Sequence, residues 1–204
     1  MANIGLIILA AGTAQRMGFP KQLMEYRGKP MVRHAAETAL ESCCRPVIVV
    51  IGAAADAVGE SLDGLPIDIV MNGQWKTGMG SSIRLGMAAL VNRDLEAAIL
   101  SLADMPLITP QILNSLVETY EASGKPIIAA EYAGTVGAPA LFSRAYFPLL
   151  EDLPFNQGCK TLILKHSHAV VRLACPEAEM DIDTPADYLR LSQVIESLKC
   201  PKLI

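Results

Sequence analysis

Two glycines, an arginine and a lysine lie close together near the start of the chain. Residues 9–21 read LAAGTAQRMGFPK and continue the apolar run IGLIILA at 4–10. Glycine lets backbone N–H groups approach an anion closely, arginine grips phosphate oxygens with a planar fork, and lysine adds a mobile charge. Gly12, Arg16 and Lys21 therefore predict a loop that wraps the polyphosphate tail of a nucleotide. A solvated surface loop with incidental charges is the alternative that spacing alone leaves open.

This loop matches neither of two common phosphate-binding patterns. G-x-G-x-x-G is absent, because Gly12 and Gly18 stand too far apart. G-x-x-x-x-G-K-[ST] also fails, because five residues separate the glycines and no Ser or Thr follows Lys21. The missing dinucleotide fingerprint argues against a Rossmann oxidoreductase.

Short apolar runs alternate with helical patterns along the chain. Continuous Ile- and Val-rich runs are typical of strands that are covered on both faces. They predict strands at 4–10, 46–51, 67–71, 97–102, 126–131 and 169–174, with helices at 31–42, 54–62, 81–92, 110–123, 157–166 and 185–198. This alternation predicts a mostly parallel, three-layer α/β/α fold. The stretch 132–160 is the least regular, and we expect an insertion or a flap over the site there.

The composition argues against several classes of protein. The 204 residues are 51% hydrophobic and 19% charged, which predicts one globular domain spanning 1–204. A net charge of −4 argues against binding to nucleic acid or to a membrane surface, and no apolar run is long enough to span a bilayer. Five cysteines without C-x-x-C spacing predict reduced thiols and a cytoplasmic location.

Small and polar residues follow the third predicted strand, where the chain reads NGQWKTGMGSSIRLG at 72–86. Gly78 relaxes the backbone, and Ser81 and Ser82 offer hydroxyls at a helix start that also offers free N–H groups. The alternative is a glycine loop in which Ser81 only caps the helix. Trp75 is expected to pack rather than to bind a ligand.

An aspartate follows the strand predicted at 97–102. Asp104 comes just after the carboxyl end of that strand, where a carboxylate can hold Mg²⁺, an ion that takes few protein ligands. Capping of a turn before Pro106 is the alternative. Loops 11–21 and 72–80 also follow strands, and open α/β sheets bind ligands at this edge. We therefore expect the three features to meet in one site.

Five motifs occur in one order along the chain. They are L-A-A-G-x-x-x-R-M-G-x-x-K at 9–21, NGQWKTGMGSSIRLG at 72–86, SLADMP at 101–106, TVGAPALF at 135–142 and DIDTPADYLRL at 181–191. In order and spacing they resemble the nucleotidyltransferases related to MobA and MocA, the enzymes of molybdopterin dinucleotide synthesis. The MocA-like branch is the more similar one, because the chain has LAAG rather than LAGG, KQL after the loop, and D-x-D-T-P-x-D near its end.

The resemblance implies a Rossmann-like nucleotidyltransferase domain of the nucleotide-diphospho-sugar transferase type. It implies transfer of CMP from CTP to a phosphorylated acceptor, the molybdenum cofactor (molybdopterin), with release of pyrophosphate and with Mg²⁺ as the cofactor. The implied catalytic residues are Arg16, Lys21 and Asp104, and the implied metal ligands are Asp104 and Asp183, with Asp181 in reserve. The implied nucleotide contacts are Leu9, Ala10, Ala11, Gly12, Arg16, Lys21, Asn72, Gly78, Ser81 and Ser82.

Several alternatives stay open at this point. GTP could replace CTP, since LAAG favours CTP only by analogy with the branch, and a sugar or polyol phosphate could replace molybdopterin. A non-catalytic factor could instead hand molybdenum cofactor to a molybdenum hydroxylase client. Asp183 also precedes a predicted helix start, so capping that helix is the alternative to binding metal.

Overall fold

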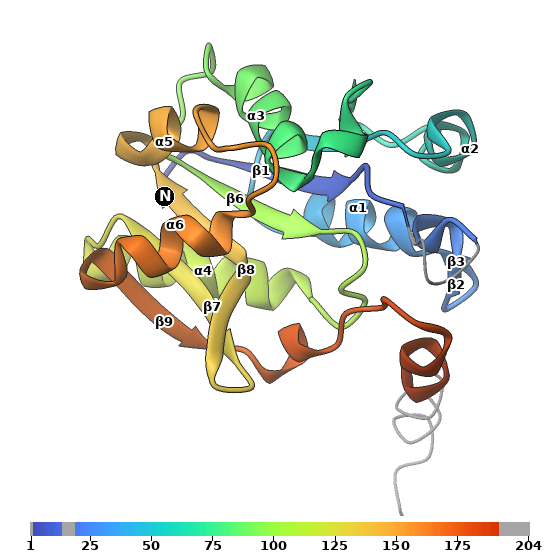
Figure 1. Ribbon diagram of the computed structural model, residues 1–204. Coiled ribbons are helices and arrows are strands. Elements are labelled where there is room, and N and C mark those ends of the chain that lie inside the picture. The colour runs from blue at the N-terminus through green and yellow to red at the C-terminus, as the bar shows by residue number, and fades with distance from the viewer. Residues whose placement is uncertain (1, 14–18, 192–204) are drawn as a thin grey trace, which may run out of the picture.

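The computed structural model describes residues 2–13 and 19–191, and its centre is a seven-stranded sheet (Figure 1). The strands are β1 (Ile4–Ala10), β4 (Val47–Ile51), β5 (Asp68–Met71), β6 (Ala97–Leu102), β7 (Ile127–Tyr132), β8 (Thr135–Ser143) and β9 (Val170–Ala174). Their order is β5-β4-β1-β6-β8-β7-β9, and β8 alone in this sheet runs antiparallel to its neighbours. The predicted mostly parallel α/β sheet is confirmed.

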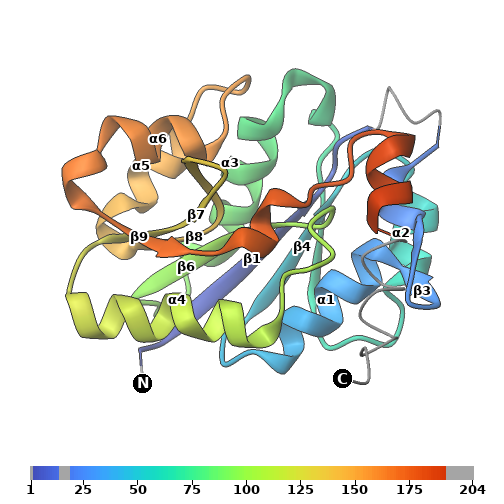
Figure 2. The same cartoon turned by 90° about the horizontal axis from the view of Figure 1, so that it is seen from below.

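Helices cover both faces of this sheet, as Figure 2 shows. One face carries α1 (Met31–Glu41) and α4 (Pro110–Ser123), and the other carries α3 (Met79–Leu90), α5 (Phe147–Glu151) and α6 (Cys159–Lys165). Each face of the sheet packs against its helices in a separate hydrophobic core. Side chains of β1 alternate between the two cores: Leu6 and Ile8 are buried on the α1 side and Ile7 on the α3 side. Within the described ranges, no helix has the length and apolar character needed to cross a bilayer.

Two smaller elements complete the fold. Helix α2 (Ala55–Ser61) follows β4, and a short hairpin of β2 (Glu25–Tyr26) and β3 (Lys29–Pro30) precedes α1. All six predicted strands and the first five predicted helices are present, with ends within two residues of those expected. The sixth helix begins at 185 as predicted and is described to 191; the rest of it lies outside the described residues.

The prediction of an insertion or flap across 132–160 is wrong for its first part. Residues 135–143 form β8, which lies inside the sheet between β6 and β7. Gly137 and Pro139 interrupt the apolar pattern there, and proline cannot donate to a strand ladder. The β7–β8 pairing shifts register between Ala129 and Ala130, so Pro139 falls in a bulge that needs no such N–H group.

The chain after β9 crosses toward the β2–β3 hairpin (Figure 1). We call residues 180–184 the crossing segment. Its Ile182 N–H donates to the backbone carbonyl of Asp104 at 3.1 Å. The helical residues 185–191 then dock through a small apolar cluster that contains Tyr26, Met31, Ile182 and Leu191. The crossing segment thereby brings Asp183 to the carboxyl end of β6.

Candidate functional site

A cavity of about 540 Å³ opens at the carboxyl ends of β1 and β6. Its volume is within the range of small-molecule sites in proteins. Eight of the residues proposed from the sequence line it: Leu9, Ala10, Ala11, Gly12, Lys21, Gly78, Ser82 and Asp104. Because β1 and β6 are adjacent and parallel, the turn after one strand and the aspartate after the other come to the same edge.

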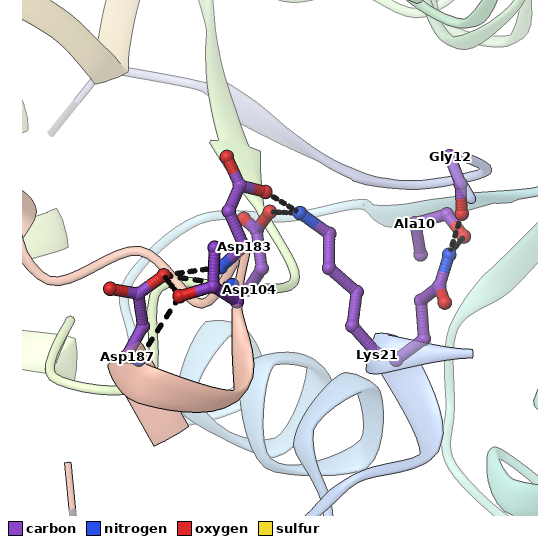
Figure 3. Close-up of polar contacts among 8 residues, drawn as sticks. Ala10, Gly12, Lys21, Asp104, Asp183 and Asp187 are labelled. Atoms are coloured by element: carbon purple, nitrogen blue, oxygen red, sulfur yellow. Dashed lines mark hydrogen bonds and ion pairs between the residues drawn. The ribbon is translucent and has the colours of Figure 1, made fainter. Parts of the chain in front are cut away.

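Lys21 lies between two carboxylates from distant parts of the chain (Figure 3). Its Nζ is 2.5 Å from Oδ2 of Asp104 and 2.6 Å from Oδ1 of Asp183. The side chains of Lys21 and Asp104 are 13% and 16% exposed, whereas that of Asp183 is 53% exposed. We call Asp104 and Asp183 the acidic pair. One ammonium group therefore bridges the acidic pair at the wall of the cavity.

One oxygen of Asp104 has no partner among the described residues. Oδ2 contacts Lys21, while Oδ1 is buried and accepts no hydrogen bond from that part of the chain. An unpaired buried acceptor is unfavourable unless a ligand satisfies it. The turn-capping alternative for Asp104 has no support here, because neither carboxylate oxygen bonds a backbone N–H group of the described residues.

The electrostatics of the acidic pair favour a cation. Burial by itself lowers the pKa of Lys21, but the carboxylates of Asp104 and Asp183 outweigh it and raise that pKa above its ordinary value. Asp181 also interacts electrostatically with Asp183, Asp104 and Lys21. Burial raises the pKa of its carboxyl group, and the neighbouring charges of Asp183 and Asp104 raise it further. Three carboxylates, those of Asp104, Asp181 and Asp183, thus lie close to the Lys21 ammonium.

Gln22 braces the first βα turn and was not assigned from the sequence. Its Nε2 donates to the carbonyl of Ala10 at 2.9 Å and also to the carbonyl of Gly12. The residue is 3% exposed, and its Oε1 is buried without a partner in the described part of the chain. Gln22 and Lys21 share one short 3₁₀ turn, Lys21–Leu23. The brace therefore also fixes the backbone that carries Lys21.

Replacing Gln22 by methionine is expected to lower the free energy of unfolding by about 1–3 kcal/mol, because the carbonyls of Ala10 and Gly12 lose their donor. Thermal or urea denaturation measures this change. Gln74→Met is the matched control, since Gln74 is exposed. A Gln22→Met protein as stable as the control would show that the turn keeps its shape without the brace.

Capping of the helix at 185–191 is carried out by the neighbours of Asp183. The hydroxyl of Thr184 accepts from the N–H of Asp187 at 3.3 Å, and Oδ2 of Asp187 accepts from the N–H of Thr184 at 2.8 Å. This reciprocal pair is a capping box. The predicted start of this helix at 185 is confirmed, and the Asp183 side chain faces Lys21 instead of serving as the cap.

Gly78 and Gly80 are required by a close backbone contact at the start of α3. A Cβ atom on Gly80 would lie 2.2 Å from the carbonyl oxygen of Pro154, and one on Gly78 would lie 2.3 Å from that of Phe155. The N–H of Gly80 donates to the carbonyl of Phe155 at 2.8 Å. The loop at 154–157 therefore caps α3, while Gly78 still lines the cavity.

Asn72 and Ser81 do not line this cavity. The Nδ2 group of Asn72 lies 2.9 Å from the hydroxyl oxygens of both Ser81 and Ser82, and its Oδ1 accepts from the N–H of Gln74 at 2.8 Å. Asn72 thus links the loop after β5 to the start of α3. Of the three residues, Ser82 lines the cavity. Contact of Asn72 or Ser81 with a nucleotide stays a prediction.

Two further predictions on individual residues have different outcomes. Arg16 lies in 14–18, outside the described residues, and its contact with phosphate stays a prediction.

Trp75, predicted to pack rather than to bind a ligand, also lines the cavity. Its Cβ packs against the backbone at Gly52, and the Lys76 ammonium lies 5.3 Å from its ring centroid. A single tryptophan gives no sequence signal that separates these two roles.

Comparison with known proteins identifies the family to which the chain belongs. Residues 6–170 match the family described as "MobA-like NTP transferase domain". The chain belongs to the MobA-like NTP transferase family. It is 34% identical over 198 residues to nicotine blue oxidoreductase from Paenarthrobacter nicotinovorans, an alignment that covers 91% of this chain and 94% of that protein.

Solved structures share the fold of this MobA-like chain. A crystal structure of Rv0371c from Mycobacterium tuberculosis is 30% identical, with a TM-score of 0.81 and coverage of 94% of this chain and 98% of that one. A second structure of Rv0371c, in complex with manganese, is 29% identical with a TM-score of 0.79 and the same coverage. Molybdopterin-guanine dinucleotide biosynthesis protein A from Archaeoglobus fulgidus has a TM-score of 0.70 over 95% of this chain and 99% of its own, but only 17% identity, and supports the fold alone.

The acidic pair of this family member fits a divalent cation. Asp104 offers a buried, unpartnered oxygen, and Asp183 offers a more exposed one. Within 2–13 and 19–191, no group of three or more His, Cys, Asp or Glu side chains is arranged to hold a metal ion. Mg²⁺ commonly takes one or two carboxylates and completes its shell with waters and substrate phosphates. Two carboxylates beside a cavity match that preference.

Replacing Gly12 by alanine is expected to weaken nucleoside triphosphate binding at least about tenfold without loss of stability, because small misplacements at a binding site have large effects. A Cβ atom on Gly12 would meet no atom of the described residues within 4 Å, and its φ is outside the left-handed region, so folding does not require glycine here. Isothermal titration and thermal denaturation measure the two quantities. Gly73→Ala, equally free of contacts and outside the cavity, is the control. Unchanged affinity of Gly12→Ala for every nucleoside triphosphate would contradict close approach of phosphate to this turn.

Proposed function

We propose that this protein transfers CMP from CTP to the terminal phosphate of a molybdopterin-type acceptor and releases pyrophosphate. The observation that carries the proposal is the Lys21 ammonium between Asp104 and Asp183 at the wall of the cavity. Membership of the MobA-like family supports a nucleoside triphosphate as donor. The LAAG motif at 9–12 favours CTP, and the molybdopterin acceptor is taken from the resemblance to the MocA-like branch.

The residues of the chain then have distinct tasks. Asp104 and Asp183 would hold Mg²⁺, which when bound neutralises charge on the phosphate oxygens. Lys21 and Arg16 stabilise the charge that develops on the leaving pyrophosphate, and the amides around Gly12 donate to its oxygens. The acceptor phosphate is ionised near neutral pH, so no general base is required. Catalysis comes mainly from positioning and electrostatics.

The experiment is a screen of the four nucleoside triphosphates with Mg²⁺ against three acceptors: molybdopterin, a sugar 1-phosphate and a polyol phosphate. Pyrophosphate release is the readout. Release with CTP and molybdopterin is the expected result. Preference for GTP would identify a guanylyltransferase, and preference for a sugar or polyol phosphate would identify another acceptor. Binding of molybdopterin without pyrophosphate release would favour a non-catalytic maturation factor that serves a molybdenum hydroxylase.

A second candidate function is oxidoreduction, and one observation favours it. The relative named nicotine blue oxidoreductase is 34% identical over 94% of its length. The first βα turn lacks the G-x-G-x-x-G pattern expected of a dinucleotide-binding site. Incubation with a quinonoid dye and NADH or NADPH tests this candidate. Consumption of the reduced nucleotide together with bleaching of the dye would support it over nucleotidyl transfer.

A further inference from the structure

Lys21 stands where the acidic pair would hold a metal ion. Its Nζ contacts one oxygen from each carboxylate, at 2.5 Å and 2.6 Å. A magnesium ion bound by the same two oxygens would lie about 2.0–2.1 Å from each of them. The ammonium and the ion would then compete for one position, and two cations cannot share it.

The surroundings allow the Lys21 side chain to leave while its backbone stays fixed. Gln22 ties the turn that carries Lys21 to the carbonyls of Ala10 and Gly12. The four-carbon stem of lysine is flexible. Lys21 also lines the cavity, so its ammonium can turn from the acidic pair toward an anion in that space.

Lys21 contacts only one of the two carboxylate oxygens of Asp104. Lys21 satisfies Oδ2 of this carboxylate, whereas the buried Oδ1 has no partner among the described residues. A purely structural ion pair would be expected to use both oxygens. The arrangement therefore fits a carboxylate that exchanges its lysine for another ligand.

We propose that Lys21 is an exchangeable occupant of the metal position. Without nucleotide it bridges Asp104 and Asp183 and excludes free divalent cations. The polyphosphate of a bound nucleotide attracts the ammonium into the cavity, which vacates the acidic pair. Metal and nucleotide then bind cooperatively, and each raises the affinity of the other by the same factor. This inference rests on the proposed function, because it requires a polyphosphate ligand in the cavity.

The test measures Mn²⁺ binding by electron paramagnetic resonance, without nucleotide, in the wild-type protein and in Lys21→Met. Removal of the competing ammonium is expected to raise Mn²⁺ affinity about tenfold, within the usual range of coupling between sites. Lys76→Met is the matched control, since it removes the same charge from the same cavity but from a lysine over Trp75. Its Mn²⁺ affinity should change less than about threefold, because water and salt screen charges at a distance.

Two further variants keep the test decisive. Lys21→Gln, which is also uncharged, replaces Lys21→Met if the latter does not fold, as judged by circular dichroism. Adding Asp104→Asn to either variant should abolish the gain, which places the bound Mn²⁺ at the acidic pair. Unchanged or weaker Mn²⁺ binding in both Lys21 variants would overturn the proposal.

The same Mn²⁺ measurement in the presence of CTP distinguishes failure of this inference from failure of the proposed function. CTP should raise Mn²⁺ affinity in the wild-type protein and raise it less in Lys21→Met, where the metal position is already free. If CTP does not bind at all, the proposed function fails, while the nucleotide-free Mn²⁺ result still decides whether Lys21 occupies the metal position. An equal gain from CTP in both proteins would overturn the exchange.

Discussion

Asp104→Asn is expected to lower the rate of nucleotidyl transfer at least about a hundredfold, because preorganised charge at a reacting phosphate is worth that much or more. Asparagine keeps the shape of the side chain but loses the charge that attracts both Lys21 and a divalent cation. The backbone carbonyl of Asp104 still accepts from the N–H of Ile182, so the crossing segment should stay in place. Pyrophosphate release measures the rate, and circular dichroism confirms the fold.

The control for this substitution is Asp63→Asn. It removes the same charge from an exposed residue after α2 and should leave the rate within about twofold, since such surface changes are usually small. Mn²⁺ binding to Asp104→Asn should weaken in parallel with the rate. If Asp104→Asn keeps a rate close to that of the control, the acidic pair does not act in the reaction and the proposed mechanism is rejected.

Gly80→Ala is expected to lower the free energy of unfolding by about 2–4 kcal/mol, through overpacking combined with a strained hydrogen bond. Its Cβ would lie 2.2 Å from the carbonyl oxygen of Pro154 and 3.0 Å from that of Gln157. These are backbone atoms, which cannot rotate away as the end of a side chain can. The loop at 154–157 must shift, and the bond from the Gly80 N–H to Phe155 is strained or lost. Urea denaturation measures the change.

Gly59→Ala is the matched control, because Gly59 lies in helix α2 and its Cβ would meet nothing closer than 3.9 Å. Alanine should stabilise that helix, by up to about 1 kcal/mol. The two variants thus make the same chemical change in opposite steric surroundings. A Gly80→Ala protein as stable as wild type would mean that the loop and α3 are not in close contact in solution.

Most of the fold is predictable from the sequence, for a physical reason. Strands β1, β4 and β6 are covered on both faces, so their residues are nearly all apolar, and the pattern marks their ends closely. Proline after threonine marks the start of α4, where the Thr109 hydroxyl accepts from the N–H of Ile112. These signals are local, and short windows of sequence contain them.

Strand β8 escaped prediction because its signals are not local. Its partner strand β7 is joined to it by a two-residue turn, Ala133–Gly134, with φ values of 46° and 73°. Such turns usually carry Asn-Gly or Asp-Gly, and alanine is rarely found with positive φ. The bulge at Pro139 further hides the alternation expected of a strand. The pairing with β6 and β7 stabilises what the local sequence does not favour.

The site is predictable where one residue type suggests one chemistry. Lys21 is predictable because it shares a loop with Gly12 and Arg16, and Asp104 because it follows the end of a buried strand; the structure brings the two side chains into contact. Gln22 could not be found in this way, since its brace to Ala10 and Gly12 depends on how the turn folds. The bridge from Asn72 to the hydroxyls of Ser81 and Ser82 could not be found from the sequence either, because it depends on how the loop after β5 meets α3.

Because the crossing segment carries Asp183, the acidic pair is complete only after this late part of the chain has been synthesised. Lys21 and Asp183 are 162 positions apart in sequence, and contacts between such distant parts of a chain form slowly. A nascent chain that has emerged as far as Ala174 already contains all seven strands of the sheet, yet it still lacks the second carboxylate. Binding competence should therefore appear on the ribosome later than the compact sheet, and only after residues 180–191 have docked.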